Sequence, residues 1–386
     1  MEKGSCGGVS STDESVVWKI SPHTAAKHSI LKRYIQAWAP ILAMGSNDKR
    51  LIYIDGFSGP GMYEGGEDGS PVVALKALKD HTLRDRFQSV EFVNIFIERE
   101  KERTDLLAQV LKERVEPLPD WIKFSIRNAE FNTEMKEILY TLQTEGKTLA
   151  PCLCFVDPFG WNALDYDVLA SIMKYEKAEL LITFMAGYLE RFVWDPQHLP
   201  SIQRLYSDEQ IRNIRMNDNK ENLVMKYFLE NLTNLIRQKG ISNELFSLSF
   251  ATYNNHNRLE YYLIYLTKHC SGFKAMKDAM FNSAKDGSYR FNDFDFDPTQ
   301  RTLVDYGQEY EWVTNASNEI YGILKAKFNQ GDNISIKAVK SIVTCETKWK
   351  YKNEILKHLE DSGKIKVVTN NRRRGTYPDR GSIVLT

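Results

Sequence analysis

A glycine-rich turn at the end of an apolar strand is the feature that most restricts the fold of this 386-residue chain. Residues 51–55 read Leu-Ile-Tyr-Ile-Asp, and residues 55–61 continue as Asp-Gly-Phe-Ser-Gly-Pro-Gly. In open α/β sheets, ligands bind outside the carboxyl ends of the strands, where glycines let the backbone approach a ligand closely. The sequence therefore predicts a ligand site at the end of the first strand, although a plain glycine turn would also produce this pattern.

The segments after this turn alternate between short apolar strands and helices. Strands are expected at residues 90–98, 122–126, 152–156 and 179–184, with helices at 71–79, 99–114, 131–143 and 166–174 between them. Short strands joined by helical crossovers indicate a parallel sheet that is covered on both faces. Two further strands, 246–252 and 259–267, are separated by a short turn and predict an antiparallel hairpin. Five parallel strands followed by such a pair predict an α/β fold, the Rossmann-like sheet of class I methyltransferases, with an N-terminal helix at 18–43.

The rest of the chain divides around this sheet. We expect a flexible tail at 1–17, the Rossmann-like domain at 18–285 with a helical insertion at about 195–240, a linker at 286–312, and a C-terminal domain at 313–386. In the last segment, helices at 318–328, 336–343 and 348–359 precede two strands, 365–369 and 382–385. Three helices and a two-stranded wing predict a winged helix.

Charge and cysteine content suggest where the protein works. The chain carries 51 basic and 51 acidic residues, but residues 334–386 hold 12 basic and 5 acidic ones, an excess of +7 that leaves −7 on the remainder. A basic module on an acidic body hints at a polyanion partner, although solvated lysines would give the same count. The five cysteines form no CxxC motif, which favours core thiols in a reducing cytoplasm over a metal site. No apolar run is long enough to span a membrane, and the polar N-terminus predicts no signal peptide.

The glycine turn differs from the two common nucleotide-binding loops. Its spacing is not the GxGxxG of dinucleotide sites, and the Lys-Ser/Thr of a phosphate-binding loop is missing. A D-x-F-x-G-x-G loop is typical of enzymes that use S-adenosylmethionine (SAM) to methylate amino groups or bases. Glu98 ends the second strand, where a carboxylate can accept hydrogen bonds from both ribose hydroxyls; Glu100 is a competing candidate. The predicted cofactor-binding residues are Asp55, Gly56, Phe57, Ser58, Gly59, Gly61, Glu98, Asn128 and Ala129.

A second turn, Asp157-Pro158-Phe159-Gly160, directly follows the fourth strand. It is similar to the Asp-Pro-Pro-Tyr/Phe loop of amino-methyltransferases, in which the acidic residue accepts from the target amino group and an aromatic ring stacks on the substrate. Methyl transfer to such a nitrogen depends mainly on positioning. Phe159 replaces the second proline and Gly160 the aromatic residue, so Trp161 is a further stacking candidate. The predicted catalytic residues are therefore Asp157, Pro158, Phe159, Gly160 and Trp161, with no metal.

These motifs together resemble the three-Cys-motif partner protein family (TcmP-like), which is similar to class I methyltransferases. The resemblance lies in His23-Thr24-x-x-Lys27-His28, the 53–61 turn, Gly69-Ser70-Pro71, the 155–160 turn, and residues 272–280, Gly-Phe-Lys-x-Met-Lys-x-Ala-Met. It covers residues 18 to 285 and implies SAM as cofactor. It also implies a partner protein that resembles radical-SAM enzymes.

Three features leave alternatives open. Residues 62–69 separate the glycine turn from the first sheet helix, and they could fold over the cofactor or spoil its site. His23, Lys27 and His28 could reach the cofactor carboxylate or the substrate, or simply begin a helix. The wing loop is rich in basic residues and therefore suits phosphate contact: Arg372, Arg373, Arg374, Lys364, Lys366 and Arg380.

The leading hypothesis is N-methylation of a nucleic acid base or nucleotide-like acceptor. The alternatives are a non-catalytic binding protein that acts through the winged helix, and an enzyme of another reaction that works with the radical-SAM-like partner.

Overall fold

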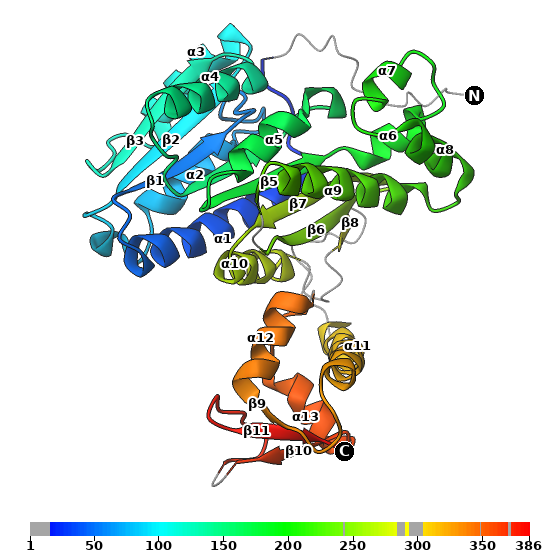
Figure 1. Ribbon diagram of the computed structural model, residues 1–386. Coiled ribbons are helices and arrows are strands. Elements are labelled where there is room, and N and C mark those ends of the chain that lie inside the picture. The colour runs from blue at the N-terminus through cyan, green and yellow to red at the C-terminus, as the bar shows by residue number, and fades with distance from the viewer. Residues whose placement is uncertain (1–15, 242–243, 284–289, 293–303, 348, 370–371) are drawn as a thin grey trace.

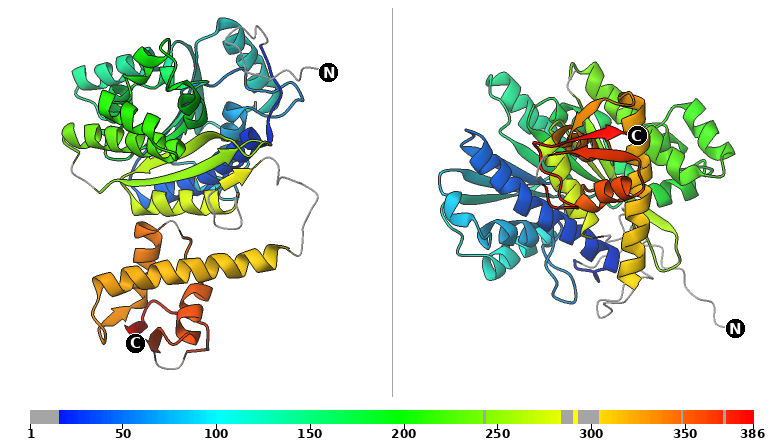
Figure 2. Two further views of the ribbon diagram at one scale, coloured as in Figure 1. Left: turned by 90° about the vertical axis from the view of Figure 1, so that its right-hand side faces the viewer. Right: turned by 90° about the horizontal axis from the view of Figure 1, so that it is seen from below.

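The computed structural model describes residues 16–241, 244–283, 290–292, 304–347, 349–369 and 372–386. It consists of a large sheet domain and a smaller C-terminal module that lies on one side of it, next to helix α10 (Figures 1 and 2). Of the predicted N-terminal tail at 1–17, only residues 16 and 17 lie within the described ranges. No helix in these ranges is long and apolar enough to cross a membrane.

The sheet has eight strands in the order β3-β2-β1-β4-β5-β7-β6-β8 (Figure 1). The strands β1 to β5 are parallel to one another, β7 is antiparallel to both β5 and β6, and β8 runs parallel to β6. This order confirms the predicted methyltransferase-type sheet. The strand bounds are β1 Arg50–Asp55, β2 Glu91–Glu98, β3 Ile122–Asn128, β4 Cys152–Val156, β5 Ala178–Phe184, β6 Phe246–Tyr253, β7 Leu259–Thr267 and β8 Arg290–Asn292.

Helices cover both faces of the sheet and enclose two hydrophobic cores. Every residue of β4 and β5 is buried, as expected for central strands that are sandwiched between helices. One core lies under α1, α2, α3 and α10, and the other lies under α4, α5 and the added helices α8 and α9. The helix bounds are α1 Pro22–Gly45, α2 Ser70–Lys79, α3 Lys101–Arg114, α4 Phe131–Thr144, α5 Tyr166–Met173, α6 Ala186–Phe192, α7 Leu199–Ile202, α8 Asp208–Met216, α9 Lys220–Gln238 and α10 Cys270–Phe281.

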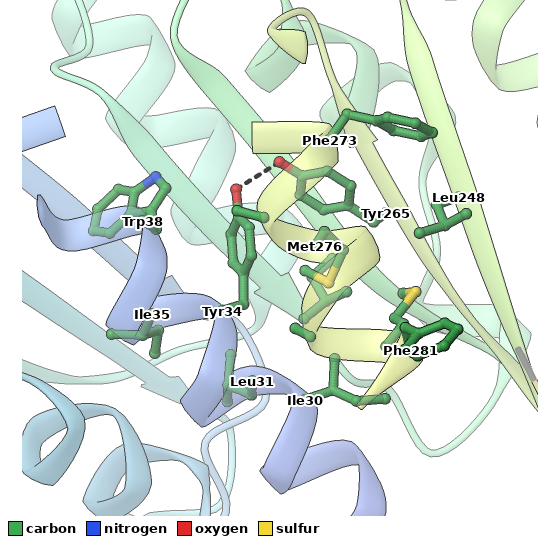
Figure 3. Close-up of a cluster of buried hydrophobic side chains, with 14 of the residues drawn as sticks. Ile30, Leu31, Tyr34, Ile35, Trp38, Leu248, Tyr265, Phe273, Met276 and Phe281 are labelled. Atoms are coloured by element: carbon green, nitrogen blue, oxygen red, sulfur yellow. Dashed lines mark hydrogen bonds between the residues drawn. The ribbon is translucent and has the colours of Figure 1, made fainter. Parts of the chain in front are cut away.

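Helix α1 is fixed to the sheet and to α10 by a buried polar group as well as by apolar packing. The helix begins after Ser21, whose hydroxyl accepts from the amide of Thr24. At the middle of the helix, the hydroxyl of Tyr34 lies 2.5 Å from a carboxylate oxygen of Glu179. It also lies 2.6 Å from the hydroxyl of Tyr265 (Figure 3). Figure 3 also shows the apolar side chains of α1 and α10 facing each other around this pair. The result is a continuous packed layer of α1, α10 and β7.

The C-terminal module contains the three helices and the hairpin that were expected, with different bounds. A short strand, β9, pairs with the last strand, so its sheet has the order β10-β11-β9. The first helix begins at Val304 and β8 at Arg290, so part of the predicted linker is regular structure; residues 293–303 of that linker lie outside the described ranges. The bounds are α11 Val304–Lys327, β9 Asn333–Ser335, α12 Ile336–Glu346, α13 Asn353–Asp361, β10 Ile365–Val368 and β11 Ser382–Leu385.

The cysteines within the described ranges form one pair of free thiols and one disulfide. Cys152 and Cys154 are buried thiols in β4, as expected. Cys270 and Cys345 form a disulfide, so the expectation of core thiols is wrong for this pair. Their separation of 75 residues explains why spacing gave no signal, because only the packing of α12 against α10 brings them together.

Candidate functional site

The predicted site residues come from neighbouring strand ends. Because β2, β1 and β4 are adjacent and parallel, Glu98, the glycine turn and Asp157 all lie at the same edge of the sheet. The register pairs Asp55 with Phe96 on one side and with Phe155 on the other. Three segments that are distant in sequence therefore face one another, as the sequence predicts.

The glycine turn is held in place by backbone hydrogen bonds to both neighbouring strands. The amide of Gly56 donates to the carbonyl of Phe155 at 2.9 Å, and the amide of Ser58 donates to the carbonyl of Ile97 at 3.0 Å. Gly59 and Gly61 have φ values of +60° and +79°, which side chains other than glycine rarely adopt. A Cβ on Gly61 would also lie 2.6 Å from the Cδ1 of Leu107. These two glycines therefore set both the shape of the turn and its closeness to α3.

Glu98 is a buried carboxylate whose two oxygens each accept a backbone amide. One oxygen accepts from Gly59 at 3.0 Å and the other from Glu100 at 2.9 Å, while only 6% of the residue is exposed. Glu100 itself is exposed and lies two residues beyond Glu98, after the end of β2. Each carboxylate oxygen retains a second lone pair, so Glu98 both anchors the glycine turn and can accept further hydroxyl donors. Glu98 is thus the better placed of the two glutamates for a ribose.

The end of β3 is hydrogen-bonded to the end of β2 beside Glu98. The side-chain amide of Asn128 donates to the carbonyls of Glu98 and Arg99 at 3.1 and 2.7 Å. The amide of Ala129 donates to the same Glu98 carbonyl at 3.1 Å. These bonds tie β3 to β2 immediately behind the Glu98 carboxylate. Phe57, which follows Gly56, lies with its ring 5.4 Å from that of Phe131 at the start of α4.

Asp55 is a fully buried carboxyl at the centre of the site. Burial raises its pKa to about 7, and the nearby charge of Asp157 adds to this, while a hydrogen bond from Ser70 acts in the opposite direction. The amide of Phe57 and the hydroxyl of Tyr53 also donate to it, at 3.3 and 3.4 Å. Asp55 therefore changes protonation near neutral pH, at the junction of β1 and the glycine turn.

Asp157 is paired with Lys27 from helix α1. The Nζ of Lys27 lies 2.6 Å from both carboxylate oxygens, and the side chains are 8% and 20% exposed. The same ammonium lies 5.2 Å from the ring centre of Tyr261 on β7. Next to it, burial and the charge of Lys27 lower the pKa of His28 to about 4, so this imidazole is neutral at pH 7. Among the N-terminal residues considered from sequence, Lys27 thus contacts a predicted site residue directly.

An aromatic cover that was not predicted lies over the glycine turn. It consists of Trp18, Tyr63, Phe159 and the guanidinium of Arg103, and we call it the roof. The Trp18 ring lies 5.3 Å from that of Phe159 and 6.0 Å from that of Tyr63, both edge to face. Arg103 lies 5.0 Å over the Trp18 ring and 5.7 Å over the Phe159 ring. The Trp18 ring would be 3.5 Å from a Cβ on Gly59, so the roof rests directly on the turn.

The insertion at residues 62–69 supports this roof. It folds back as a tight loop in which Met62 and Asp68 form a β-bridge and the amide of Tyr63 donates to the carbonyl of Glu67 at 3.0 Å. Asp68 is held by Arg114 at 2.8 Å. The amide of Glu64 donates to the carbonyl of Trp18 at 3.0 Å, which links the loop to the N-terminal segment. The insertion is therefore an ordered loop that is bonded to the N-terminal segment beside Trp18.

The loop after β4 divides its two aromatic residues between surface and core. Phe159 is 66% exposed, whereas Trp161 is only 6% exposed. Trp161 packs against Phe192 and His198, and its indole N–H donates to Ser201 at 3.2 Å. The expectation that Trp161 stacks on a substrate is therefore wrong: its ring anchors the helical insertion, and Phe159 remains the accessible aromatic side chain. Gly160 lies in a bend between the two aromatic residues, and Pro158 precedes Phe159.

Two surface grooves lie away from these strand ends. One, of about 690 Å³, is formed between α4 and α5 beside Tyr140 and Lys174. The other, of about 570 Å³, lies between α1 and α10 beside Arg33 and Lys274. Neither includes a predicted site residue.

Comparisons with known proteins give a likeness of fold only. No family model matches the sequence, and no curated protein matches it. Among solved structures, Trm1 from Pyrococcus horikoshii in complex with SAM is similar over 67% of this chain, with 12% identity and a TM-score of 0.39. The matched part of this chain spans 59% of the length of that Trm1 chain.

Two O-methyltransferases are similar to the same extent. TomG from Streptomyces achromogenes, in complex with SAM, shares 17% identity over 65% of this chain and 82% of its own, with a TM-score of 0.34. An O-methyltransferase from Bacillus cereus, in complex with SAH, shares 12% identity over 65% of this chain and 83% of its own, with the same TM-score. The roles of individual residues must therefore be argued from the geometry of this chain itself.

Proposed function

We propose that the chain is a SAM-dependent methyltransferase that methylates a nitrogen of a nucleic acid base or a nucleotide-like acceptor. The observation that carries the proposal is the arrangement of three strand ends: Glu98 bound to the amide of Gly59, and Asp157 one strand further along. Glu98 follows β2, the glycine turn follows β1, and Asp157 follows β4, so these three groups lie next to one another at one edge of the sheet. The proposal assigns the ribose hydroxyls to Glu98, the cofactor backbone contacts to the turn, and the acceptor to Asp157. The resemblance to the three-Cys-motif partner family is consistent with this assignment.

The residues at the turn fit a ribose-bearing cofactor. The second lone pairs of the Glu98 oxygens suit two hydroxyl donors, and Gly59 and Gly61 present bare backbone beside them. When bound, SAM supplies an electrophilic methyl group. The roof of Trp18, Phe159 and Arg103 would exclude water from this position, which strengthens every electrostatic interaction beneath it.

The acceptor side depends on Asp157 and Phe159. An amino nitrogen needs its lone pair directed at the methyl group, and a carboxylate oxygen that accepts one of its N–H bonds provides this orientation. Lys27 fixes the rotamer of Asp157 by donating to both of its carboxylate oxygens. Phe159, exposed beside it, offers a face on which a planar base can stack. The nitrogen loses its proton to solvent after transfer, so no strong base is required.

The first test is calorimetric titration of the full chain with SAM and with S-adenosylhomocysteine. Glu98→Ala should abolish binding, whereas Glu100→Ala, which changes the exposed neighbouring carboxylate, should leave binding unchanged. Circular dichroism and thermal melting of both variants would show that each is folded, because Glu98 also holds the turn. If the folded wild-type chain binds neither compound at high protein concentration, the proposal is wrong.

The C-terminal module extends the proposal to a partner. Its element order, one helix, a strand, two helices and a hairpin, suits a winged helix, and we propose that it contacts the phosphates of a nucleic acid substrate. Two of the wing arginines are engaged within the module: Arg372 pairs with Glu360, and Arg374 lies 2.9 Å from Asp361. Phosphate contact would therefore depend more on the exposed side chains of Lys366, Arg373 and Arg380. A radical-SAM-like protein remains a second proposed partner, on the resemblance alone.

One observation favours the alternative of a non-catalytic binding protein. Both oxygens of Glu98 already accept backbone amides, and the roof covers the turn, an arrangement in which these residues serve only to hold the fold together. In that case substitutions in the exposed wing would abolish partner binding, while Glu98→Ala would behave as wild type in every functional assay. A third possibility, another reaction shared with the radical-SAM-like partner, would give a product whose mass gain differs from that of one methyl group.

A further inference from the structure

Helix α10 contacts both the sheet domain and the C-terminal module. Towards the sheet, Phe273 and Met276 pack into the core with α1 (Figure 3). On the same side, Gly272 lies so close to β5 and β7 that a Cβ would be 2.4 Å from an oxygen of Glu179. Towards the module, α10 presents Cys270 and Lys277 to helix α12. Movement of the module must therefore be accommodated at this one helix.

The ammonium group of Lys277 binds the backbone carbonyls at and just after the C-terminal end of α12. Its Nζ lies within hydrogen-bond distance of four backbone carbonyls, those of Val343 (2.8 Å), Thr344 (2.6 Å), Thr347 (2.5 Å) and Trp349 (2.9 Å). The side chain is almost completely buried, with 2% of the residue exposed. The last carbonyls of a helix have no hydrogen-bond donor within the helix, and they form the negative end of the helix dipole. An ammonium group supplies donors to these carbonyls and a positive charge beside the negative end. Burial nevertheless lowers the pKa of Lys277 to about 7.

The disulfide between Cys270 and Cys345 lies beside the ammonium group of Lys277. Cys345 belongs to the same last turn of α12 that Lys277 caps, and it is bonded to Cys270 at the first residue of α10. Both cysteines are half-buried, so a small thiol or disulfide reagent can approach them. The bridge connects α10 to α12, whose apolar side chains belong to one continuous hydrophobic cluster. Its reduction opens a covalent link and removes no apolar side chain from this cluster.

Other contacts at the junction are polar or aromatic and do not depend on the disulfide. Lys350 lies 3.2 Å from Asp278. At the end of α10, Phe281 packs edge to face on Trp312 at 5.4 Å, and Lys352 lies over both rings. These contacts and Lys277 can hold the module in place when the disulfide is open, but more weakly, because a covalent link raises the effective concentration of the two surfaces.

We propose that Cys270 and Cys345 form a reversible thiol-modification site that locks the C-terminal module onto α10. In the oxidising direction, the two thiols lose two protons and two electrons to a small-molecule disulfide such as oxidised glutathione, which is released as two thiols through a mixed disulfide. In the reduced form the module is held chiefly by Lys277 and exchanges between docked and undocked states. This inference holds whether or not the sheet domain transfers methyl groups.

Hydrogen exchange of the full chain, with and without reducing agent, tests the proposal. Backbone amides at 343–347 are measured, with α5 as an internal reference. In the oxidised wild type these amides should be protected. Reduction alone should speed their exchange about tenfold, and reduction together with Lys277→Met at least a hundredfold. In oxidised Lys277→Met, the disulfide should keep the increase below tenfold.

The control variant is Lys274→Met, which removes an exposed lysine one turn away on the same helix. It should match wild type in both redox states. Cys345→Ser, measured without reducing agent, should reproduce the reduced wild type and exclude effects of the reagent on other thiols. Equal protection in the oxidised chain, the reduced chain and Cys345→Ser would show that the disulfide does not control docking and would overturn the proposal. Loss of α5 protection on reduction would overturn it too, because the bridge would then support the whole fold.

Discussion

Lys27 and Asp157, which are separated by 130 residues, form a two-pronged ion pair in which one ammonium lies 2.6 Å from both carboxylate oxygens. The pair joins the N-terminal helix to the loop after β4. It consequently fixes the side chain to which the proposed function assigns the orientation of the acceptor.

Breaking this pair should separate turnover from cofactor binding. In Lys27→Met, Asp157 loses its fixed rotamer, and the rate of methyl transfer should fall on the order of 100-fold, the usual consequence of misplacing a reacting group by about 1 Å. The dissociation constant for SAM should stay within about twofold of wild type. Lys27→Arg, which retains a donor pair, should recover part of the rate. Unchanged kcat in folded Lys27→Met, or a loss of cofactor affinity equal to the loss of rate, would remove the positioning role. Asp157→Ala should likewise keep cofactor affinity and lose turnover.

The roof should control entry and exit of the cofactor. Trp18→Ala removes two aromatic pairs, with Phe159 and Tyr63, and a cation–π contact, together worth about 2 kcal/mol, so the roof should open at least tenfold more often. Stopped-flow measurement should then show faster dissociation of S-adenosylhomocysteine. The control is Trp194→Ala, an exposed tryptophan outside the roof. If both variants release the compound at the wild-type rate, Trp18 does not gate the site.

Two glycines allow backbone strain and steric clash to be measured separately. Gly61 and Gly66 both have positive φ, +79° and +87°, but only at Gly61 would a Cβ meet another atom, the Cδ1 of Leu107 at 2.6 Å. Gly66→Ala should therefore cost about 1–2 kcal/mol in the free energy of unfolding. Gly61→Ala should cost about 1–3 kcal/mol more, because α3 must also move. Urea denaturation of both variants measures the difference, and equal values would mean that the turn adapts freely.

Stability should decrease as the pH rises towards 7 because of Glu179. Burial raises the pKa of this carboxyl from 4.5 in a model compound to about 7, so the folded state binds its proton more tightly than the unfolded state does. Its contribution is complete below about pH 4.5 and is lost as the pH rises through 7, a change on the order of 3 kcal/mol. Glu179→Gln, which stays neutral, should flatten this part of the curve. Asp55 titrates in the same window and should leave a residual slope, so the test is the difference between the two curves. A parallel shift of the whole curve would contradict the assignment.

Arg372 and Arg373 of the wing should have different roles, Arg372 in the stability of the module and Arg373 in nucleic acid binding. Arg372 is bound to Glu360, close to Tyr377, so Arg372→Ala should lower the melting temperature of the module. Arg373→Ala, at an exposed position, should leave melting unchanged and weaken binding of a single-stranded oligonucleotide, with a smaller dependence of affinity on salt. Fluorescence anisotropy at two salt concentrations distinguishes these effects. Equal affinity for Arg373→Ala and wild type would argue against phosphate contact by the wing.

The sequence predicts the sheet and the strand-end residues well because both depend on local patterns. The buried run of β4 and the glycine spacing after β1 are signals within a few residues. The roof and the disulfide depend on contacts between segments far apart in the chain, which no local pattern reports. Trp161 illustrates the limit: its position after Asp157 suggested stacking, but the helical insertion supplies Phe192 and His198 to bury it.

The position of Trp18 has a practical consequence for the design of expression vectors. A vector whose reading frame begins after Trp18 would remove the ring that rests on Gly59 and packs against Phe159, and the shortened protein would lack the roof. Shortening from the other end would instead damage the C-terminal module, because the last strand, β11, is paired on both sides there. Assays that find no activity in a protein shortened past Trp18 should therefore be repeated with the full chain.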